Sequence, residues 1–93
     1  MILRFSCKET EKLARGRISR KLPTGIQRIA ARKLKLLNDS VELNDLRVPP
    51  ANRLEALKGS RKGQHSIRIN DQWRICFRWY KGNASDVEIV DYH

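Results

Sequence analysis

The sequence predicts an α+β fold, with two to three helices in the N-terminal half and a small antiparallel β-sheet in the C-terminal half. Residues 73–79, WRICFRW, put apolar side chains on one face and Arg or Cys on the other, the pattern of a half-buried strand. Residues 24–38 carry apolar side chains at helical spacing. Residues 86–93 form a further strand pattern that can pair with 73–79.

Length and charge narrow the function classes. The 93 residues predict one domain spanning 1–93. Lys and Arg number 20 against 10 Asp and Glu, a net charge of +10 that favours nucleic acid, an anionic membrane or an acidic protein as partner. Membrane is disfavoured because no apolar run approaches the ~20 residues of a spanning helix. The N-terminus, interrupted by Arg4 and Lys8, does not read as a signal peptide, so we expect a cytoplasmic protein.

The cysteines and histidines predict neither a disulfide framework nor a metal site. Cys7 and Cys76 are the two cysteines in a chain with enough apolar residues for a core, which favours reduced thiols. His65 and His93 do not combine with them into a recognisable zinc spacing. We therefore expect chemistry without a metal or other cofactor.

The first elements are predicted from local signals. Residues 2–5 suggest a short strand, and Ser6 with Glu9 has the spacing of a capping box that opens a short helix. Gly16 is expected to end that helix.

The principal helix is expected over residues 24–38, opened by a second capping-box pattern at Thr24 and Gln27. Its cations lie on other parts of the helix surface. They either face solvent or bind a partner, which would be an acidic protein or RNA. They are Arg28, Arg32 and Lys35. Asp39 and Glu42 can cap a third, short helix through Leu46.

Proline and glycine bound the next segment. Pro49-Pro50 is expected to end the third helix, because a proline disfavours helix at the residue before it. Residues 53–57 are interpreted as a strand before the glycine-bounded loop 59–63.

The central hairpin joins residues 66–69 to 73–79. A two-residue turn would put Arg74 on the core face, so we expect a three-residue loop over 70–72. This register pairs Ile69 with Trp73, Ile67 with Ile75 and Arg68 with Arg74. Like charges facing each other are unfavourable, so the arginine pair suggests an anionic ligand, unless the two side chains splay into solvent.

The last strand is expected to pair antiparallel with 73–79 so that apolar residues meet on one face. The predicted pairs are Trp79–Val87, Phe77–Ile89, Arg78–Glu88, Cys76–Val90 and Arg74–Tyr92. This register would put Arg74 and Tyr92 side by side, with His93 next to them.

A basic site with a phenol and an imidazole would result, which suits cleavage of RNA. The ribose 2′-hydroxyl is the nucleophile, so the protein needs only a base, an acid and cations that stabilise charge on the phosphate. The predicted members are Arg68, Arg74, Tyr92 and His93, with Lys58 or Arg61 reaching in from the glycine-bounded loop.

Alternative interpretations stand beside these roles. If Tyr92 has no catalytic role, it is an aromatic residue at the edge of the sheet. If His93 has none, it is a frayed terminal residue. His65 shares a face with Ile67 and is interpreted as a histidine at the edge of the core. Cys76 is interpreted as a small buried hydrophobe, because no base is placed to activate it.

Several runs of the sequence resemble the HigB-type toxins, a branch of the RelE/ParE superfamily of bacterial toxin-antitoxin modules. They are LKGSRKGQHSIRINDQWRICF, the ending VEIVDYH, the opening MILRFSCKETEKL and PPANRLEAL. The resemblance implies helices packed on one face of a RelE-like antiparallel sheet. It implies a toxin that cleaves mRNA in the ribosomal A site without metal and inhibits translation. It also implies silencing by a HigA-type helix-turn-helix antitoxin in a hetero-oligomer.

By position, the resemblance assigns Lys58 and Arg74 to phosphate binding and transition-state stabilisation, and Tyr92 and His93 to proton transfer. It leaves open which of these two is the base. RNA or phosphate contacts are expected from Arg61, Lys62, Arg68 and Asp91. Where some HigB proteins have a histidine before the L-K-G turn, this chain has Glu55-Ala56.

Two other functions remain open from the sequence. A ParE-like toxin would inhibit DNA gyrase by binding, without cleavage and without needing Tyr92 and His93. A basic RNA-binding module without activity would depend on charge and show a steep salt dependence.

Overall fold

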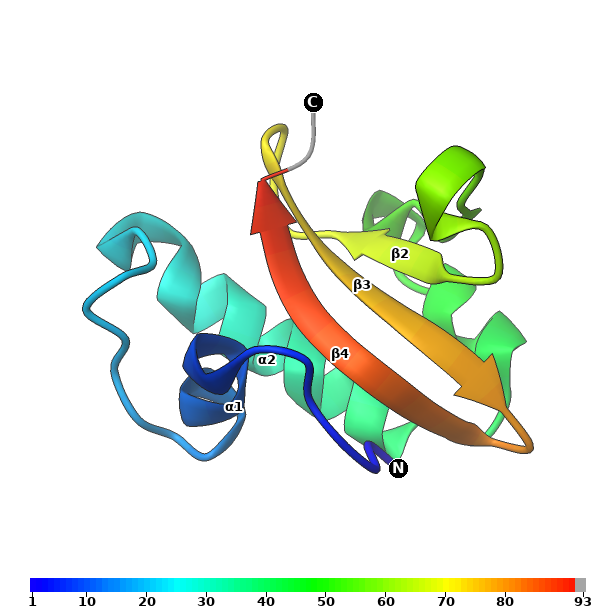
Figure 1. The fold of residues 1–93 in the computed structure, drawn as a ribbon, viewed down its shortest axis with the longest axis horizontal. Helices are drawn as coiled ribbons and strands as arrows, with labels where there is room; N and C mark the ends of the chain where they lie inside the picture. The colour runs from blue at the N-terminus through cyan, green and yellow to red at the C-terminus, as the bar shows by residue number, and fades with distance from the viewer. Residues whose placement is uncertain (92–93) are drawn as a thin grey trace.

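The computed structural model describes residues 1–91 as two α-helices and a four-stranded antiparallel sheet of order β1-β2-β3-β4 (Figure 1). The elements are α1 (Lys8–Ala14), α2 (Thr24–Asp39), β1 (Glu55–Ala56), β2 (His65–Arg68), β3 (Trp73–Tyr80) and β4 (Asn83–Asp91), with 3₁₀ helices η1 (Leu43–Arg47), η2 (Pro50–Asn52) and η3 (Gly59–Arg61). The predicted α+β fold is confirmed.

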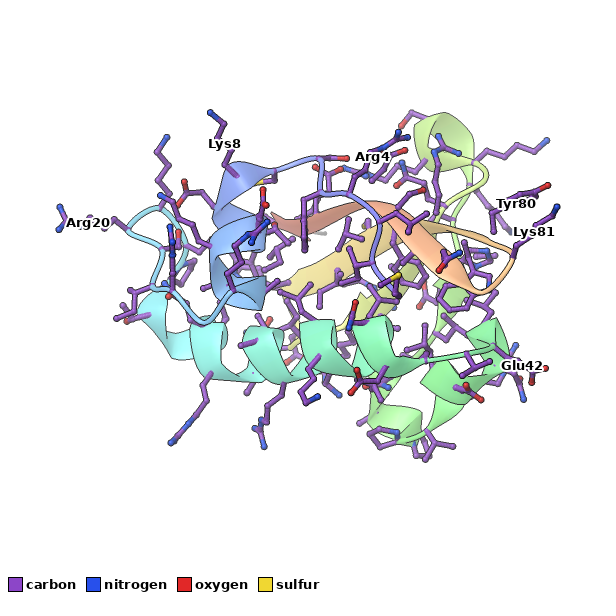
Figure 2. All side chains as sticks on the ribbon, turned by 90° about the horizontal axis from the view of Figure 1, so that it is seen from below. Arg4, Lys8, Arg20, Glu42, Tyr80 and Lys81 are labelled. Atoms are coloured by element: carbon purple, nitrogen blue, oxygen red, sulfur yellow. The ribbon has the colours of Figure 1, made fainter. Side chains whose placement is uncertain are left out.

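The core lies between α2 and one face of the sheet (Figure 2). The predicted apolar stripe of α2 supplies Ile26, Ala30, Leu34 and Leu37, and the sheet supplies Ile67, Ile75, Phe77, Val87 and Ile89. Trp73 and Trp79 are half-buried at its margin. The alternation along 73–79 therefore predicted the core face correctly.

The N-terminal segment covers the outer edge of β4. Ile2 and Phe5 form isolated parallel bridges to Ala84 and Val87, in place of the short strand expected over residues 2–5. Further along, the backbone N–H of Ile89 donates to the Thr10 hydroxyl of α1 at 2.9 Å. Edge groups that would otherwise remain unpaired are thus bonded within the chain.

The two predicted N-terminal capping boxes are wrong. Cys7 and Pro23 precede α1 and α2, and neither N-cap side chain bonds the helix. The Gln27 carboxamide instead donates to the carbonyl oxygens of Ser19 and Leu22, at 2.7 and 2.9 Å. These two carbonyls have no partner within a helix, so the Gln27 side chain satisfies them and fixes the linker before α2. Gly16, with φ of 79°, follows α1 as predicted.

The region between α2 and β2 is less regular than expected. The third helix is the 3₁₀ helix η1, capped by Glu42 and Asp45, whereas Asp39 is the last residue of α2. The strand expected over 53–57 shortens to the two residues of β1. Arg53 has φ of 44°, a left-handed conformation that a strand does not contain.

The β2–β3 register is the predicted one. Ile67 pairs with Ile75, and Arg68 pairs with Arg74. The Asn70 side-chain oxygen accepts hydrogen bonds from the backbone of Gln72 and Trp73, which closes the three-residue loop.

The predicted β3–β4 register is wrong. The two-residue turn Lys81-Gly82, with φ of 48° and 80°, replaces the expected longer loop and pairs Tyr80 with Asn83. An irregularity follows, where β4 holds one extra residue between the pairs Arg78–Ser85 and Cys76–Glu88.

In the observed register, the residues of β3 have different partners on β4 from those predicted. Arg74 pairs with Val90 instead of Tyr92, and Ile75, instead of Phe77, pairs with Ile89. Arg78 lies 3.4 Å from the carboxylate of Asp86 instead of facing Glu88. Among the described residues, no helix has the length and apolar character needed to cross a membrane.

Candidate functional site

Arg74 is the centre of the candidate site, and its side chain starts from the sheet face opposite the α2 core. It is 8% exposed. Its Nε donates to the Ser66 hydroxyl at 2.7 Å, and its Nη2 donates to the Arg53 carbonyl at 2.6 Å. The Glu55 carboxylate lies 3.8 Å from Nη2. A nearly buried guanidinium is thus held by acceptors from three segments, which fixes its orientation.

The position of the Arg53 carbonyl depends on a buried amide. Asn52 is completely buried, and its Nδ2 donates to the carbonyls of Leu46 and Val48 at 3.1 and 3.3 Å. This anchors η2, and the left-handed residue Arg53 follows it directly. The sequence did not predict this support, because the acceptors in it are backbone carbonyls, which have no sequence signal. Ser66, by contrast, has the same strand parity as Arg68 and could have been recognised.

The arginine pair on β2 and β3 is separated by internal contacts. Arg74 turns to Ser66, whereas Arg68 forms an ion pair with Asp71 of the hairpin loop. The predicted adjacency of the two backbone positions is confirmed. The juxtaposition does not by itself require an external anion, since the two charges have separate partners.

The loop after β1 brings further cations toward this face. Arg61 donates to the Glu88 carboxylate at 2.9 Å and to Gln64 at 3.0 Å, so it is tied to β4. Lys58 and Lys62 flank η3 and are exposed. Figure 2 shows this segment on the side of the sheet opposite α2. The structure therefore offers Lys58 and Lys62 to a ligand and uses Arg61 within the fold.

Cys76 and His65 were predicted to belong to the core or its edge, and the structure confirms this. Cys76 is completely buried, and burial raises the pKa of its thiol, which disfavours the nucleophilic thiolate. His65 is half-buried and stacks on Phe77 with ring centroids 6.0 Å apart. Burial lowers the pKa of His65. Both residues serve packing.

The C-terminal part of the predicted site is only partly described. Asp91 pairs with Trp73, the residue before Arg74, and accepts a hydrogen bond from Gln72 at 3.0 Å. Strand β4 thus ends at the Arg74 end of β3 (Figure 1). Tyr92 and His93 lie outside the described residues, so their roles stay predictions.

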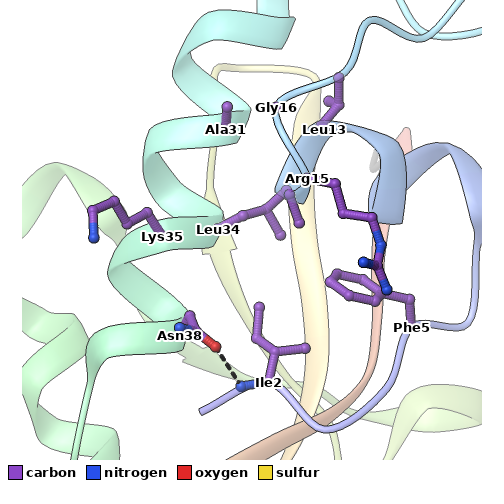
Figure 3. Close-up of a pocket in the computed structure, with 10 residues that line it drawn as sticks. Ile2, Phe5, Leu13, Arg15, Gly16, Ala31, Leu34, Lys35 and Asn38 are labelled. Atoms are coloured by element: carbon purple, nitrogen blue, oxygen red, sulfur yellow. Dashed lines mark hydrogen bonds between the residues drawn. The ribbon is translucent and has the colours of Figure 1, made fainter.

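A separate hollow lies away from the site around Arg74. A groove of about 500 Å³ separates α1, α2 and the N-terminal segment, where Ile2 donates its backbone N–H to Asn38 at 2.9 Å (Figure 3). Phe5, Leu13 and Leu34 make its walls apolar. It contains none of the predicted site residues.

Comparison with known proteins identifies the family. The family model described as "RelE-like toxin of type II toxin-antitoxin system HigB" matches residues 7–93. The chain belongs to this HigB-like toxin family. It is 45% identical over 65 residues to Toxin HigB-1 of Vibrio cholerae, covering 70% of this chain and 68% of that protein. It is 33% identical over 61 residues to Endoribonuclease HigB of Proteus vulgaris, covering 66% and 65%.

Solved structures agree with the HigB-like assignment at the level of fold. A crystal structure of a YafQ variant from E. coli superposes with a TM-score of 0.66 at 17% identity, covering 98% of this chain and 91% of that one. YafQ from E. coli strain BL21(DE3) gives 0.64 at 16% identity with the same coverage. The HigB-like chain therefore shares its helix-on-sheet architecture with YafQ.

Proposed function

We propose that this HigB-like toxin is a ribosome-dependent endoribonuclease that cleaves mRNA in the ribosomal A site and thereby inhibits translation. The observation that carries the proposal is the nearly buried Arg74 guanidinium, which Ser66 and Arg53 hold in place. A preorganised cation in a poorly solvated site stabilises developing negative charge more strongly than a mobile surface cation. The name of the Proteus vulgaris relative supports the reaction class.

The reaction needs no protein nucleophile. The ribose 2′-oxygen attacks the adjacent phosphorus and loses its proton to a base, while the bond to the 5′-oxygen breaks and an acid protonates that oxygen. Arg74 and Lys58 are proposed to stabilise the charge on the nonbridging phosphate oxygens. Tyr92 and His93 are proposed to transfer the protons, and neither step calls for a metal ion.

Glu55 lies next to Arg74 and is proposed to affect its charge. Its carboxylate faces Arg74 at 3.8 Å and is about half exposed, and it belongs to the pair Glu55-Ala56 that stands where the resemblance places a histidine in some HigB proteins. A phosphate arriving at Arg74 would compete with this carboxylate for the guanidinium. Glu55 is therefore proposed to balance the buried charge until the substrate arrives, and proton transfer is assigned to the C-terminal pair.

Dependence on the ribosome is proposed because the domain is small. In-line attack requires the 2′-oxygen, the phosphorus and the leaving oxygen to be aligned, and such ordering supplies a large part of the rate. A domain of 93 residues has little surface with which to order a flexible RNA, whereas the A site holds a codon in place. We therefore expect weak cleavage of protein-free RNA.

The partners follow from the same family assignment. A toxin of a type II module has an antitoxin, and we propose a HigA-type protein with a helix-turn-helix domain that silences this chain in a toxin–antitoxin hetero-oligomer. The proposed place of action is the cytoplasm, where ribosomes translate.

A cell-free translation assay that maps mRNA cut sites tests the function. Arg74→Ala is expected to lower the cleavage rate by about 10²- to 10³-fold, the usual effect of removing one transition-state donor. Tyr92→Phe and a truncation lacking His93 are expected to impair cleavage. Arg78→Ala is the matched control, because it removes an exposed cation from the same strand.

Three results would contradict the proposal. Cleavage at the wild-type rate by Arg74→Ala would remove this residue from the reaction. Robust cutting of protein-free transcripts would exclude ribosome dependence. Absence of cleavage by the wild type, together with inhibition of DNA gyrase supercoiling, would replace the nuclease with the ParE-like alternative.

A further inference from the structure

A cationic hollow lies at the edge of the sheet, apart from the site around Arg74. It has a volume of about 340 Å³ and lies between α2, η2 and the end of β2. Three cations, Arg32, Lys33 and Arg68, surround it. Its apolar lining consists of Ile29, Leu36, Ala51 and Ile69.

Lys33 is held in this hollow by a rigid acceptor. Its ammonium donates to the Oδ1 atom of Asn52, the completely buried amide whose Nδ2 is bonded to the carbonyls of Leu46 and Val48. Because both ends of the Asn52 carboxamide are engaged, the lysine amine has a defined position. A mobile surface lysine would lack such an anchor.

Among the described residues, one of the three cations of the hollow, Arg68, forms an ion pair with a carboxylate. Partial burial lowers the pKa of Lys33, and the positive charges of Arg32 and Arg68 lower it further. Arg68 pairs with Asp71, whose side chain is 99% exposed, so this ion pair is screened by solvent. The positive potential thus persists where the three cations converge.

Arg68 connects the hollow to the site around Arg74. The two arginines are paired across β2 and β3, yet the charge of Arg68 also acts on Lys33 of α2. This is geometrically feasible because β1 pairs only with His65 and Ser66, which leaves the Arg68 end of β2 beyond the β1 ladder. Arg68 is thus the residue that lines the hollow and is also paired with Arg74.

We propose that the hollow of Arg32, Lys33 and Arg68 binds a backbone phosphate of single-stranded RNA that flanks the phosphodiester at Arg74. The planar guanidinium groups match phosphate oxygens, and the anchored lysine adds a point charge. The apolar lining suits the carbon face of a ribose. An RNA strand carries a charge at every nucleotide, so one molecule can contact both sites, which an isolated anion cannot. The flanking role rests on the proposed function.

The test measures RNA binding separately from cleavage. Fluorescence anisotropy of a labelled single-stranded RNA oligonucleotide, recorded over a range of KCl concentrations, gives affinity and salt slope for Lys33→Gln and Arg68→Gln. Each variant is expected to bind about 5- to 10-fold more weakly and to reduce the salt slope by about 0.7, as for one lost phosphate contact on a single strand. Circular dichroism checks that each variant is folded.

Arg28→Gln is the matched control. It removes the same charge from an exposed position of α2 that does not line the hollow. Its affinity and salt slope are expected to stay close to wild type. An equal loss in Arg28→Gln would overturn the proposal, because binding would then reflect net charge alone.

Further outcomes separate this proposal from the nuclease function and from an acidic protein partner. If the wild type fails to cleave but Lys33→Gln and Arg68→Gln still lose RNA selectively, the phosphate site stands and the nuclease function falls. Wild-type RNA affinity in both variants would overturn the site, whatever the cleavage result. Loss of polyglutamate binding with retained RNA binding would also overturn it, in favour of an acidic protein.

Discussion

Arg74 shows what a sequence can and cannot reveal about a single residue. Strand parity predicted that it lies on the face opposite the core, and the resemblance predicted a phosphate role. Its acceptors were not predictable in the same way. The Arg53 carbonyl is in place because of a left-handed residue and a buried asparagine, and neither has a periodic sequence signal. Burial of the guanidinium is thus a tertiary property.

Ser66→Ala tests the support of Arg74. Loss of the hydroxyl leaves Nε without its acceptor, and a bond to a charged group contributes about 2 kcal/mol, so the free energy of unfolding should fall by that amount. Urea denaturation measures it. Cleavage should also weaken, because the guanidinium loses its fixed orientation.

Ser60→Ala, which changes an exposed serine in η3, is the control for Ser66→Ala and should change little. Stability and cleavage of Ser66→Ala equal to those of wild type would show that the Arg74 orientation does not depend on this bond.

Among the elements, the hairpin of β2 and β3 was predictable and the pairing of β3 with β4 was not. In the hairpin, alternating apolar residues and the exclusion of Arg74 from the core left one register. In the second pair, the extra residue of β4 shifts the parity, and Asp86 within it has φ of 51°. A single bulge changes all pairs beyond it, so apolar matching alone selected a wrong register.

Gly82→Ala tests the turn that sets the β3–β4 register. An added Cβ would lie 3.1 Å from the Val41 carbonyl, at a residue with φ of 80°. We expect a loss of about 1–2 kcal/mol in the free energy of unfolding, from the left-handed conformation alone. Thermal and urea denaturation measure it.

Gly25→Ala is the matched control for the turn. Gly25 lies in α2, and a Cβ there meets no atom within 4 Å. Alanine favours helix, so this variant should be as stable as wild type or more stable. A Gly82→Ala protein that is no less stable than Gly25→Ala would contradict the role of the turn.

On the scale of the whole molecule, the chain has a net charge of +10. Local ion pairs offset part of the repulsion among its cations. Asp86 contacts Arg4 at 2.7 Å and Arg78 at 3.4 Å, so one carboxylate joins the N-terminal segment to β3 and β4. Asp86 therefore reduces the repulsion between the two cations that it contacts.

Acid is expected to destabilise the protein. Four carboxyl groups, Glu9, Asp39, Asp45 and Asp86, have lowered pKa values, caused first by bonds from Ser19, Lys35, the Glu42 backbone and Arg4, respectively. A lowered folded pKa gives stability that is complete above the unfolded value, 3.8 for Asp and 4.5 for Glu, and is lost as the pH falls through the folded value.

Urea midpoints at pH 7, 4.5 and 3, at constant ionic strength, measure this loss. The midpoint should fall modestly between the first two, because burial lowers the pKa of His65 and the imidazole of the unfolded chain is therefore protonated first as the pH falls below 6.5. It should fall further at pH 3, where the carboxyl groups also take up protons. Asp45→Asn should decline less steeply with pH than wild type, since one titrating group is removed. A constant midpoint down to pH 3 would show that these bonds do not stabilise the fold.

The contact between Thr10 and Ile89 has a consequence for the timing of folding. The two residues are 79 positions apart. At a synthesis rate of about 5–20 residues per second, α1 emerges roughly 4 to 16 seconds before the strand whose edge it covers. Throughout that interval α1 lacks the strand edge that it covers, and the core lacks Val87 and Ile89. During its own translation, the toxin therefore spends several seconds without the strand that completes its core.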